Sequence, residues 1–333
     1  MKKDILAVEN LSTHFSTKAG IVKAVDDVSF KLQAGHVLGL VGESGSGKSQ
    51  TGYSILGLVD NPGKIVAGKV FLNGQNLREL PERDLRKLRG NRIAMIFQDP
   101  MLTLNPVLRI DTQMIESVQA HFPVSQEKAR ALAREALVKV GIASPDERLM
   151  AYPHQFSGGM RQRVAIAIAL LHKPDVIIAD EPTTALDVTI QEQILFEMQK
   201  LARDSGTALI WITHDLSVIA GLADRIAVMY AGKIVEEGPA DELLQNPKHP
   251  YTYGLINSAP SRNSRGRPLY QIPGVTPNLA NLTSGCSFKS RCTRALQVCD
   301  QNPTLSRLDE IRSLRCFNPQ PVFADFANSG ANA

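Results

Sequence analysis

Apolar side chains are grouped into short runs as far as about residue 230, and their spacing predicts the elements of the fold. Two stretches, 5–11 and 25–32, alternate apolar and polar positions, which predicts antiparallel strands. Other apolar runs are short and nearly continuous, as buried strands are: 37–41, 93–97, 176–179, 208–213 and 226–229. Stretches with helical spacing separate them: 49–58, 160–171, 189–204 and 216–222. This alternation favours an α/β fold with a mostly parallel sheet covered by helices.

Two regions depart from the alternating pattern. Residues 110–149 have apolar positions at helical spacing, which indicates an inserted helical region. Ser157 is well placed to be the N-cap of the helix predicted at 160–171. After about residue 236 prolines become frequent, and we expect a linker and a small loop-rich extension. The domain boundaries predicted from these changes are 4–238 for the main domain, about 99–163 for its helical insert, 239–325 for the extension and 326–333 for a disordered tail.

Size and composition are those of a globular protein. A chain of 333 residues suggests a main body with an appendage, and 43% apolar residues suffice for a full core. The net charge of +4 suits a membrane surface or nucleic acid and is diagnostic of neither. The best apolar run, 164–171, is far shorter than the roughly 20 residues that span a bilayer. The first residues also lack the apolar region of a signal peptide. We therefore expect a soluble protein whose membrane role depends on partners.

A glycine-rich loop at 42–49 stands between a predicted strand and a predicted helix. This context is that of a Walker A loop, and it makes a chance match a poor alternative. The glycines let backbone N–H groups face a phosphate, and the helix N-terminus favours the anion. Lys48 would contact the β- and γ-phosphates, and Ser49 would bind Mg²⁺. The predicted nucleotide-binding residues of the loop are Gly42, Glu43, Ser44, Gly45, Ser46, Gly47, Lys48 and Ser49.

Two acidic residues end the apolar run at 176–179. Asp180 would hold Mg²⁺, as a Walker B aspartate does. Glu181 could act as the general base that polarises an attacking water molecule. An acidic pair that caps a helix is the structural alternative.

Several short segments occur together in the order typical of one protein family. These are the loop at 42–49, Gln98, the turn at 157–162, the pair at 180–181, the segment 185–187 and His214. Together they resemble an ATP-binding cassette (ABC) ATPase over residues 4 to about 235. The resemblance implies a P-loop NTPase with a RecA-like core, an antiparallel β subdomain and an inserted α-helical subdomain, here followed by the C-terminal extension. It also implies ATP and Mg²⁺ as ligands and ATP hydrolysis as the activity.

The resemblance assigns roles to residues that carry little signal alone. Gln98 matches a glutamine that touches Mg²⁺ and the attacking water, and His214 matches a histidine that contacts the γ-phosphate and holds Glu181 in place. By itself, His214 would more often be a structural histidine. Phe15 matches the aromatic ring that stacks on adenine, with a core aromatic residue as the alternative reading and His14 as the neighbouring candidate.

A second group of residues matches positions that act between two copies of the fold. Ser157, Gly158 and Gly159 match the signature turn, which binds the γ-phosphate of nucleotide held by another copy. Gln162 belongs to the same signature segment, and Asp187 matches an aspartate that bridges the two halves. The resemblance therefore implies a dimer as well as a reaction.

All the cysteines lie in the last fifth of the chain, with gaps of five, six and sixteen residues. These gaps differ from the Cys-x₂-Cys pairs of a zinc ribbon. The segment resembles the C-terminal domain of dipeptide and oligopeptide transporter ATPases, some of which carry a four-iron, four-sulfur cluster. A 4Fe-4S cluster is therefore expected, with zinc or free thiols as alternatives. Its ligands would be Cys286, Cys292, Cys299 and Cys316.

Further segments, 98–106, 249–255 and 272–279, also resemble peptide-importer ATPases. The function expected is an ATPase subunit that powers import of dipeptides and oligopeptides, peripheral on the cytoplasmic face of the inner membrane. The expected partners are a second homologous ATPase subunit, two transmembrane permease subunits and an extracytoplasmic peptide-binding protein. Nucleic acid is not expected, because no basic patch is interleaved with aromatic residues. The alternatives are an importer for nickel, opines or antimicrobial peptides, and a soluble ABC ATPase of DNA repair or translation.

Overall fold

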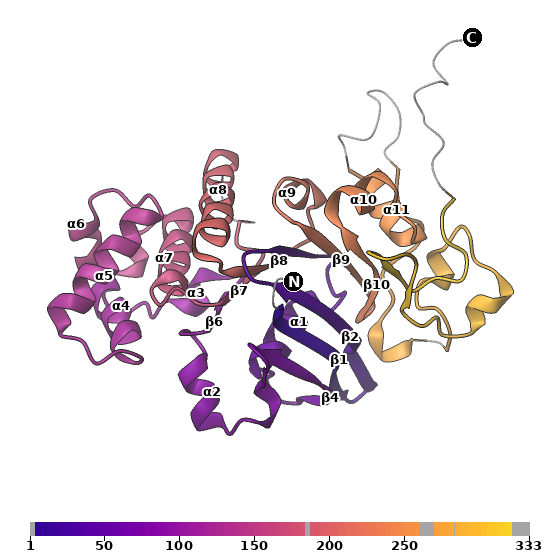
Figure 1. The fold of residues 1–333 in the computed structure, drawn as a ribbon, viewed down its shortest axis with the longest axis horizontal. Coiled ribbons are helices and arrows are strands. Elements are labelled where there is room, and N and C mark those ends of the chain that lie inside the picture. The colour runs from indigo at the N-terminus through magenta and orange to yellow at the C-terminus, as the bar shows by residue number, and fades with distance from the viewer. Residues whose placement is uncertain (1–3, 184–186, 260–269, 283, 322–333) are drawn as a thin grey trace, which may run out of the picture.

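The computed structural model describes residues 4–183, 187–259, 270–282 and 284–321. The predicted tail at 326–333 and residues 185 and 186 of the bridging segment lie outside these ranges. In the described part, the strands form a sheet of eight and a sheet of four. Figure 1 shows the larger sheet at the centre, the helical insert on one side and the C-terminal extension on the other. Within the same ranges, no helix is both long and apolar enough to cross a membrane.

The larger sheet has the order β11-β12-β10-β9-β3-β8-β7-β6. Strands β9, β3, β8, β7 and β6 are parallel, and β10 joins β9 antiparallel. Every residue of β3, β7 and β8 is buried, which explains why these strands appear in the sequence as continuous apolar runs. The bounds are β3 Val37–Val41, β6 Ile93–Ile96, β7 Val176–Asp180, β8 Ala208–Thr213, β9 Arg225–Tyr230, β10 Lys233–Pro239, β11 Ser306–Arg307 and β12 Ser313–Leu314.

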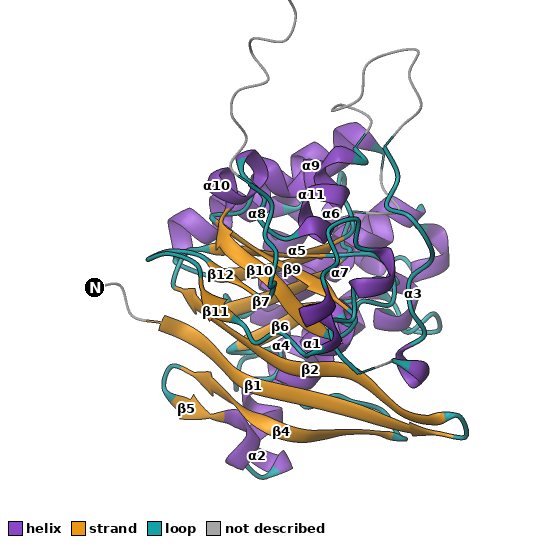
Figure 2. Ribbon diagram, turned by 90° about the vertical axis from the view of Figure 1, so that its right-hand side faces the viewer, coloured by secondary structure: helices purple, strands orange, loops and turns teal. Residues whose placement is uncertain are grey.

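The smaller sheet is antiparallel, with the order β2-β1-β4-β5. It lies beneath the larger sheet in Figure 2, and apolar side chains of the two sheets, such as Leu6 and Leu40, share one core. The two alternating stretches of the sequence are confirmed as parts of β1 and β2. The bounds are β1 Asp4–Thr17, β2 Gly20–Gln33, β4 Gly63–Leu72 and β5 Gln75–Asn76.

Helices cover the larger sheet and form the insert. In the insert, buried alanines at 129, 133 and 136 let α5 pack closely on α4 and α7. Ser157 caps α7, as predicted, by accepting a hydrogen bond from the backbone N–H of Met160 at 3.3 Å. The bounds are α1 Lys48–Leu56, α2 Glu82–Leu88, α3 Pro100–Thr103, α4 Ile110–Gln119, α5 Gln126–Lys139, α6 Pro145–Met150, α7 Gly158–Leu170, α8 Val188–Ser205, α9 Leu216–Ala220, α10 Ala240–Gln245 and α11 Pro250–Asn257.

The expectation of a linker from about residue 236 is wrong over its first part. Strand β10 continues to Pro239, and α10 and α11 follow it. Prolines begin these helices: Pro239 is the N-cap of α10 and Pro250 occupies the first turn of α11. The later part is loop-rich as expected, with short 3₁₀ turns at Leu279–Asn281, Lys289–Arg291 and Gln297–Asp300. The domain division at 238 remains a prediction.

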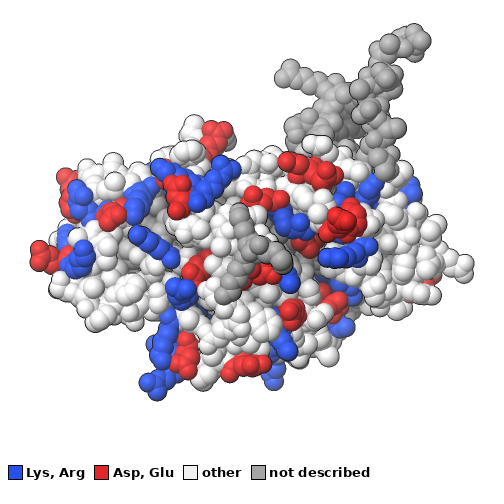
Figure 3. Space-filling model, viewed as in Figure 1, with Lys and Arg blue, Asp and Glu red and all other residues white. Residues whose placement is uncertain are grey.

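Charged side chains are mixed on the face shown in Figure 3, where Lys and Arg lie among Asp and Glu. This distribution matches the small net charge of +4.

A buried histidine gives the extension a predicted pH dependence. His249 is 1% exposed, and its Nδ1 accepts a hydrogen bond from the N–H of Tyr251 at the start of α11. Burial lowers the pKa of His249 from 6.5 to about 3, against a smaller opposite effect of a backbone hydrogen bond at Arg315. The unfolded chain therefore takes up a proton near pH 6.5, whereas the folded chain does not.

Stability should consequently fall as the pH drops through 6.5 towards 3, and be unaffected by this group at higher pH. Between pH 7 and pH 5, we expect the wild type to lose about 2 kcal/mol more unfolding free energy than His249→Asn, which keeps an acceptor at the cap. Urea unfolding followed by the fluorescence of Trp211, the only tryptophan of the chain, measures this difference. Equal pH dependence in the two proteins would contradict it.

Candidate functional site

Four predicted segments meet at the carboxyl edge of the larger sheet. The glycine-rich loop follows β3, Glu181 follows β7, His214 follows β8 and Gln98 follows β6. Because these parallel strands are neighbours in the order β3-β8-β7-β6, their carboxyl ends bring the segments together. They line a cleft of about 760 Å³. The other wall belongs to the C-terminal extension: Leu255, Ser258, Tyr270, Gln271, Ile272 and Arg291.

The conformation of the loop requires glycine at two positions in particular. A Cβ at Gly42 would lie 2.3 Å from the carbonyl oxygen of Met229, and one at Gly47 would lie 2.1 Å from that of Ala24. Gly47 also has a φ of 102°. The tightly curled backbone leads directly into α1, whose free N–H groups form an anion-binding end. The loop therefore fits a phosphate group.

Lys48 lies inside the curl of the loop. Its ammonium group donates hydrogen bonds to the carbonyl oxygens of Gly42 at 2.8 Å and Glu43 at 2.9 Å. Burial lowers the pKa of Lys48, although the charges of Glu181, Asp180 and Glu43 act in the opposite direction. A phosphate entering the loop would thus meet a cation that is poorly solvated and already oriented.

Ser49 and Asp180 form an oxygen pair beside Lys48. The Ser49 hydroxyl donates to Asp180 Oδ1 at 2.9 Å, and Asp180 is 1% exposed. Burial, together with the charge of Glu181, raises the pKa of Asp180 to about 6, while Ser49 and Lys48 oppose this rise. A hydroxyl and a carboxylate next to a phosphate loop are the oxygen ligands that Mg²⁺ takes. The residues present therefore fit the ion that the sequence predicts.

The carboxylate of Glu181 is held between two side chains. Gln98 Nε2 donates to Glu181 Oε2 at 3.2 Å, and His214 Nδ1 lies 3.2 Å from Glu181 Oε1. The backbone of Glu181 has a φ of 45°, unusual for a residue other than glycine, and its N–H donates to Ile212. Unusual backbone conformations of this kind are common at functional sites. The arrangement orients an acidic side chain at the cleft, where it could accept a proton from water.

Other predicted residues lie outside the described lining of this cleft. Ser157 and Gly158 are exposed at the start of α7, and Asp187 is exposed at the N-cap of α8. Gln162 is 2% exposed, and its amide has no hydrogen-bond partner among the described residues. Phe15 is half-buried on β1, where it pairs with Gly63 of β4. Their roles remain predictions.

The prediction of a 4Fe-4S cluster is wrong. Among the described residues, which include all the cysteines, no group of three or more His, Cys, Asp or Glu side chains is placed to hold a metal ion. The same finding opposes zinc. Burial raises the pKa of the Cys286, Cys292 and Cys316 thiols, the last to about 11, so they stay protonated near neutral pH. None of the four cysteines is in a disulfide bond.

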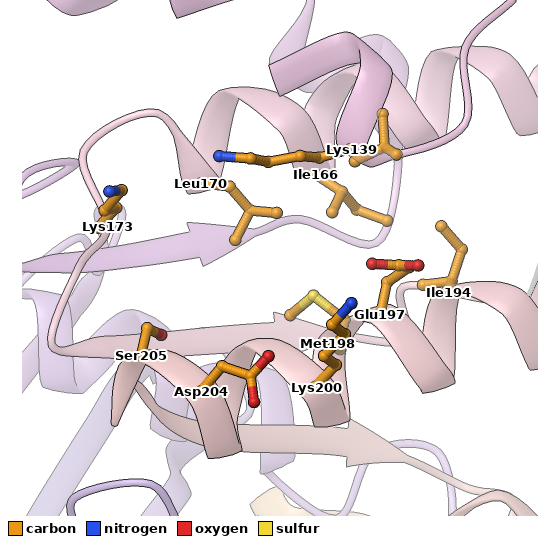
Figure 4. Close-up of a pocket in the computed structure, with 11 residues that line it drawn as sticks. Lys139, Ile166, Leu170, Lys173, Ile194, Glu197, Met198, Lys200, Asp204 and Ser205 are labelled. Atoms are coloured by element: carbon orange, nitrogen blue, oxygen red, sulfur yellow. The ribbon is translucent and has the colours of Figure 1, made fainter. Parts of the chain in front are cut away.

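A second cavity, of about 290 Å³, lies between α5, α7 and α8. Figure 4 shows aliphatic side chains such as Ile166, Leu170 and Met198 within it and charged groups such as Lys139 and Asp204 around it. No predicted site residue is among the described residues that line it.

Sequence reasoning missed the contribution of the extension to the cleft. Arg291 pairs with Glu43 of the loop although 248 residues separate them. Arg291 directly precedes Cys292, in the segment for which the sequence predicts a cluster. Nothing in the local sequence indicates which carboxylate a distant arginine will meet.

Comparison with known proteins matches both parts of the chain. The family model described as "ABC transporter" matches residues 25–184, and that described as "Oligopeptide/dipeptide transporter, C-terminal region" matches residues 235–299. The oligopeptide transport ATP-binding protein OppD of Salmonella typhimurium is 46% identical over 315 residues, covering 95% of this chain and 94% of the relative. A probable peptide ABC transporter ATP-binding protein, y4tR of Sinorhizobium fredii, is 49% identical over 322 residues, covering 96% of each.

Solved structures match most of the chain. The ATP-binding cassette MJ0796, described as a dimer in a post-hydrolysis state bound to ADP and Pi, has a TM-score of 0.64 and 29% sequence identity. The match covers 71% of this chain and 98% of the cassette. A second dimeric structure of MJ0796, described as a bacterial ABC transporter cassette, also matches with a TM-score of 0.64.

Proposed function

Because the chain belongs to the ABC transporter ATPases, in the group that includes the oligopeptide transport ATP-binding proteins, we propose that it powers the import of dipeptides and oligopeptides. It has the cassette fold predicted from its sequence, and its reaction is the hydrolysis of ATP. The observation that carries the proposal is the meeting of the glycine-rich loop, Glu181 and His214 at one cleft, next to an extension of the oligopeptide transporter type. Lys48 of the loop lies close enough to Glu181 to interact with it electrostatically.

In the proposed mechanism, the loop N–H groups and Lys48 bind the β- and γ-phosphates. Ser49 and Asp180 would hold Mg²⁺, which would supply positive charge to the phosphates. Glu181 accepts the proton of the attacking water, and its two neighbours, Gln98 and His214, keep its carboxylate oriented. Phe15 is proposed to stack on adenine.

We propose further that the active assembly contains two cassettes. The exposed Ser157 turn of one cassette completes the cleft of the other, and Asp187 bridges the two. The dimeric structures of MJ0796 support this arrangement. The second cassette is proposed to be a homologous ATPase subunit. Two transmembrane permease subunits and an extracytoplasmic peptide-binding protein complete the importer, which places this chain on the cytoplasmic face of the inner membrane.

Transport by the assembled complex tests the proposal. The chain is co-expressed with its permease and ATPase partners, purified and reconstituted into vesicles together with the binding protein. Peptides are expected to stimulate ATP hydrolysis and to accumulate in the vesicles, and a complex with Glu181→Gln serves as the inactive control. Stimulation by Ni²⁺ instead of peptides would contradict the proposed cargo. The absence of co-purifying membrane proteins would contradict the transporter itself.

A further inference from the structure

One residue of the glycine-rich loop, Glu43, is bound from three sides by the C-terminal part of the chain. Arg291 donates two hydrogen bonds to its carboxylate, at 2.7 and 3.0 Å. Thr276 donates a third to the same carboxylate at 2.8 Å. The backbone N–H of Glu43 donates to the hydroxyl of Tyr251 at 2.8 Å. The loop and the extension are therefore directly connected at the proposed nucleotide site.

The arginine in this connection is itself rigidly held. The Arg291 side chain is 5% exposed, and its Nε donates to the carbonyl oxygen of Pro273 at 2.9 Å. Its guanidinium lies 5.9 Å from the centre of the Tyr230 ring, a distance that allows a cation–π contact. Tyr230 packs in turn against Tyr251 and Phe288 in a buried aromatic cluster. Arg291 is thus presented to the loop in one orientation.

Glu43 places a negative charge in a loop that binds phosphate. Burial tends to raise its pKa, but hydrogen bonds from Arg291 and Thr276 and the charge of Arg291 outweigh this, so the pKa of Glu43 lies below its usual value. The side chain is therefore ionised, and it lies close enough to Lys48 to affect the lysine electrostatically. Without a partner, this carboxylate would repel the triphosphate and offset part of the attraction of Lys48.

We propose that Arg291 is a positioning residue for nucleotide binding, which neutralises Glu43 and holds the phosphate loop, so that the C-terminal extension sets the affinity for ATP. This inference rests on the proposed nucleotide site at the loop. The bidentate pair and the Tyr251 contact give the extension a means of controlling the first step of the ATPase cycle.

The matched substitutions Arg291→Gln and Arg291→Lys separate charge from geometry. Both lose the two-pronged contact, and only lysine keeps the positive charge. We expect Arg291→Gln to weaken binding of Mg²⁺–ATP by about 10-fold, and Arg291→Lys by about 3-fold or less. Adding Glu43→Gln to Arg291→Gln should recover most of the lost affinity, because it removes the uncompensated charge. The deficit of Arg291→Gln should also shrink as salt is raised.

Titration calorimetry on the full chain, in a Glu181→Gln background that prevents turnover, measures these affinities. Arg315→Gln is the control: this arginine is in the same extension, is 6% exposed and pairs with Asp27 of β2 rather than with Glu43 of the loop. We expect Arg315→Gln in this background to bind ATP as tightly as the Glu181→Gln protein does. Equal affinities for the lysine and glutamine variants, or no recovery in the double variant, would overturn the inference. A separate result would contradict the proposed nucleotide site itself: the Glu181→Gln protein does not bind ATP, or binds it no better than the same protein with Lys48→Ala added.

Discussion

Glu181→Gln is expected to slow ATP hydrolysis by about 100-fold or more while ATP binding is retained. Glutamine has nearly the shape of glutamate, and its amide can keep hydrogen bonds with Gln98 and His214 through its oxygen and nitrogen. It cannot accept a proton from water. The loop, Lys48, Ser49 and Asp180 are untouched, so the groups that would hold the nucleotide remain in place. Phosphate release under saturating ATP measures the rate, and calorimetric titration with Mg²⁺–ATP measures binding.

Glu82→Gln is a suitable control for this experiment. Glu82 pairs with Arg89 at the surface of α2 and is not among the residues that line the cleft, so its loss should leave turnover intact. His214→Ala is expected to fall between the control and Glu181→Gln, because it removes only one of two groups that orient the carboxylate. Turnover by Glu181→Gln at the wild-type rate would falsify the assignment of Glu181 as the base.

The sequence predicts the core of the cleft because each of its residues directly follows a buried strand. The apolar runs that end before Gly42, Gln98 and Glu181 identify strands of one parallel sheet, and parallel neighbours bring their carboxyl ends together. The order of the motifs then leads to the family. For these segments, the local sequence pattern identifies the strands, and the geometry of a parallel sheet then places the residues that follow them.

The C-terminal part is less predictable because its structure depends on contacts between distant residues. A proline in the sequence can indicate either a loop or the start of a helix. Only the structure shows that the prolines at α10 and α11 lie at helix N-termini. The cysteines are equally ambiguous: resemblance to transporter ATPases led us to expect a cluster, whereas the packing around each thiol sets its burial and its pKa. The pairing of Arg291 with Glu43 likewise follows from tertiary structure alone.

Ser157, in the turn at the start of α7, is exposed and does not line the cleft of its own chain. Ser157→Asp should reduce hydrolysis by about 100-fold or more, because a carboxylate would face the phosphates of the partner's nucleotide. Ser157→Asn should be affected far less. Aspartate and asparagine both cap helices as well as serine does, so the pair differs in charge while the helix start is preserved. Each variant should still bind ATP through its own loop.

Mixing two inactive variants tests whether the active site is shared between chains. Lys48→Ala and Ser157→Asp should each be nearly inactive alone, since every cleft in either dimer lacks one component. In a mixed dimer, one cleft combines both defects and the other has an intact loop and an intact turn. In a homodimer of this chain, formed when the proposed homologous subunit is left out, random exchange of subunits should therefore restore about a quarter of the wild-type turnover, because half of the dimers have one working cleft of two. Turnover should also rise with chain concentration in the wild type. No recovery on mixing, together with wild-type turnover independent of concentration, would mean that a single chain contains a complete site.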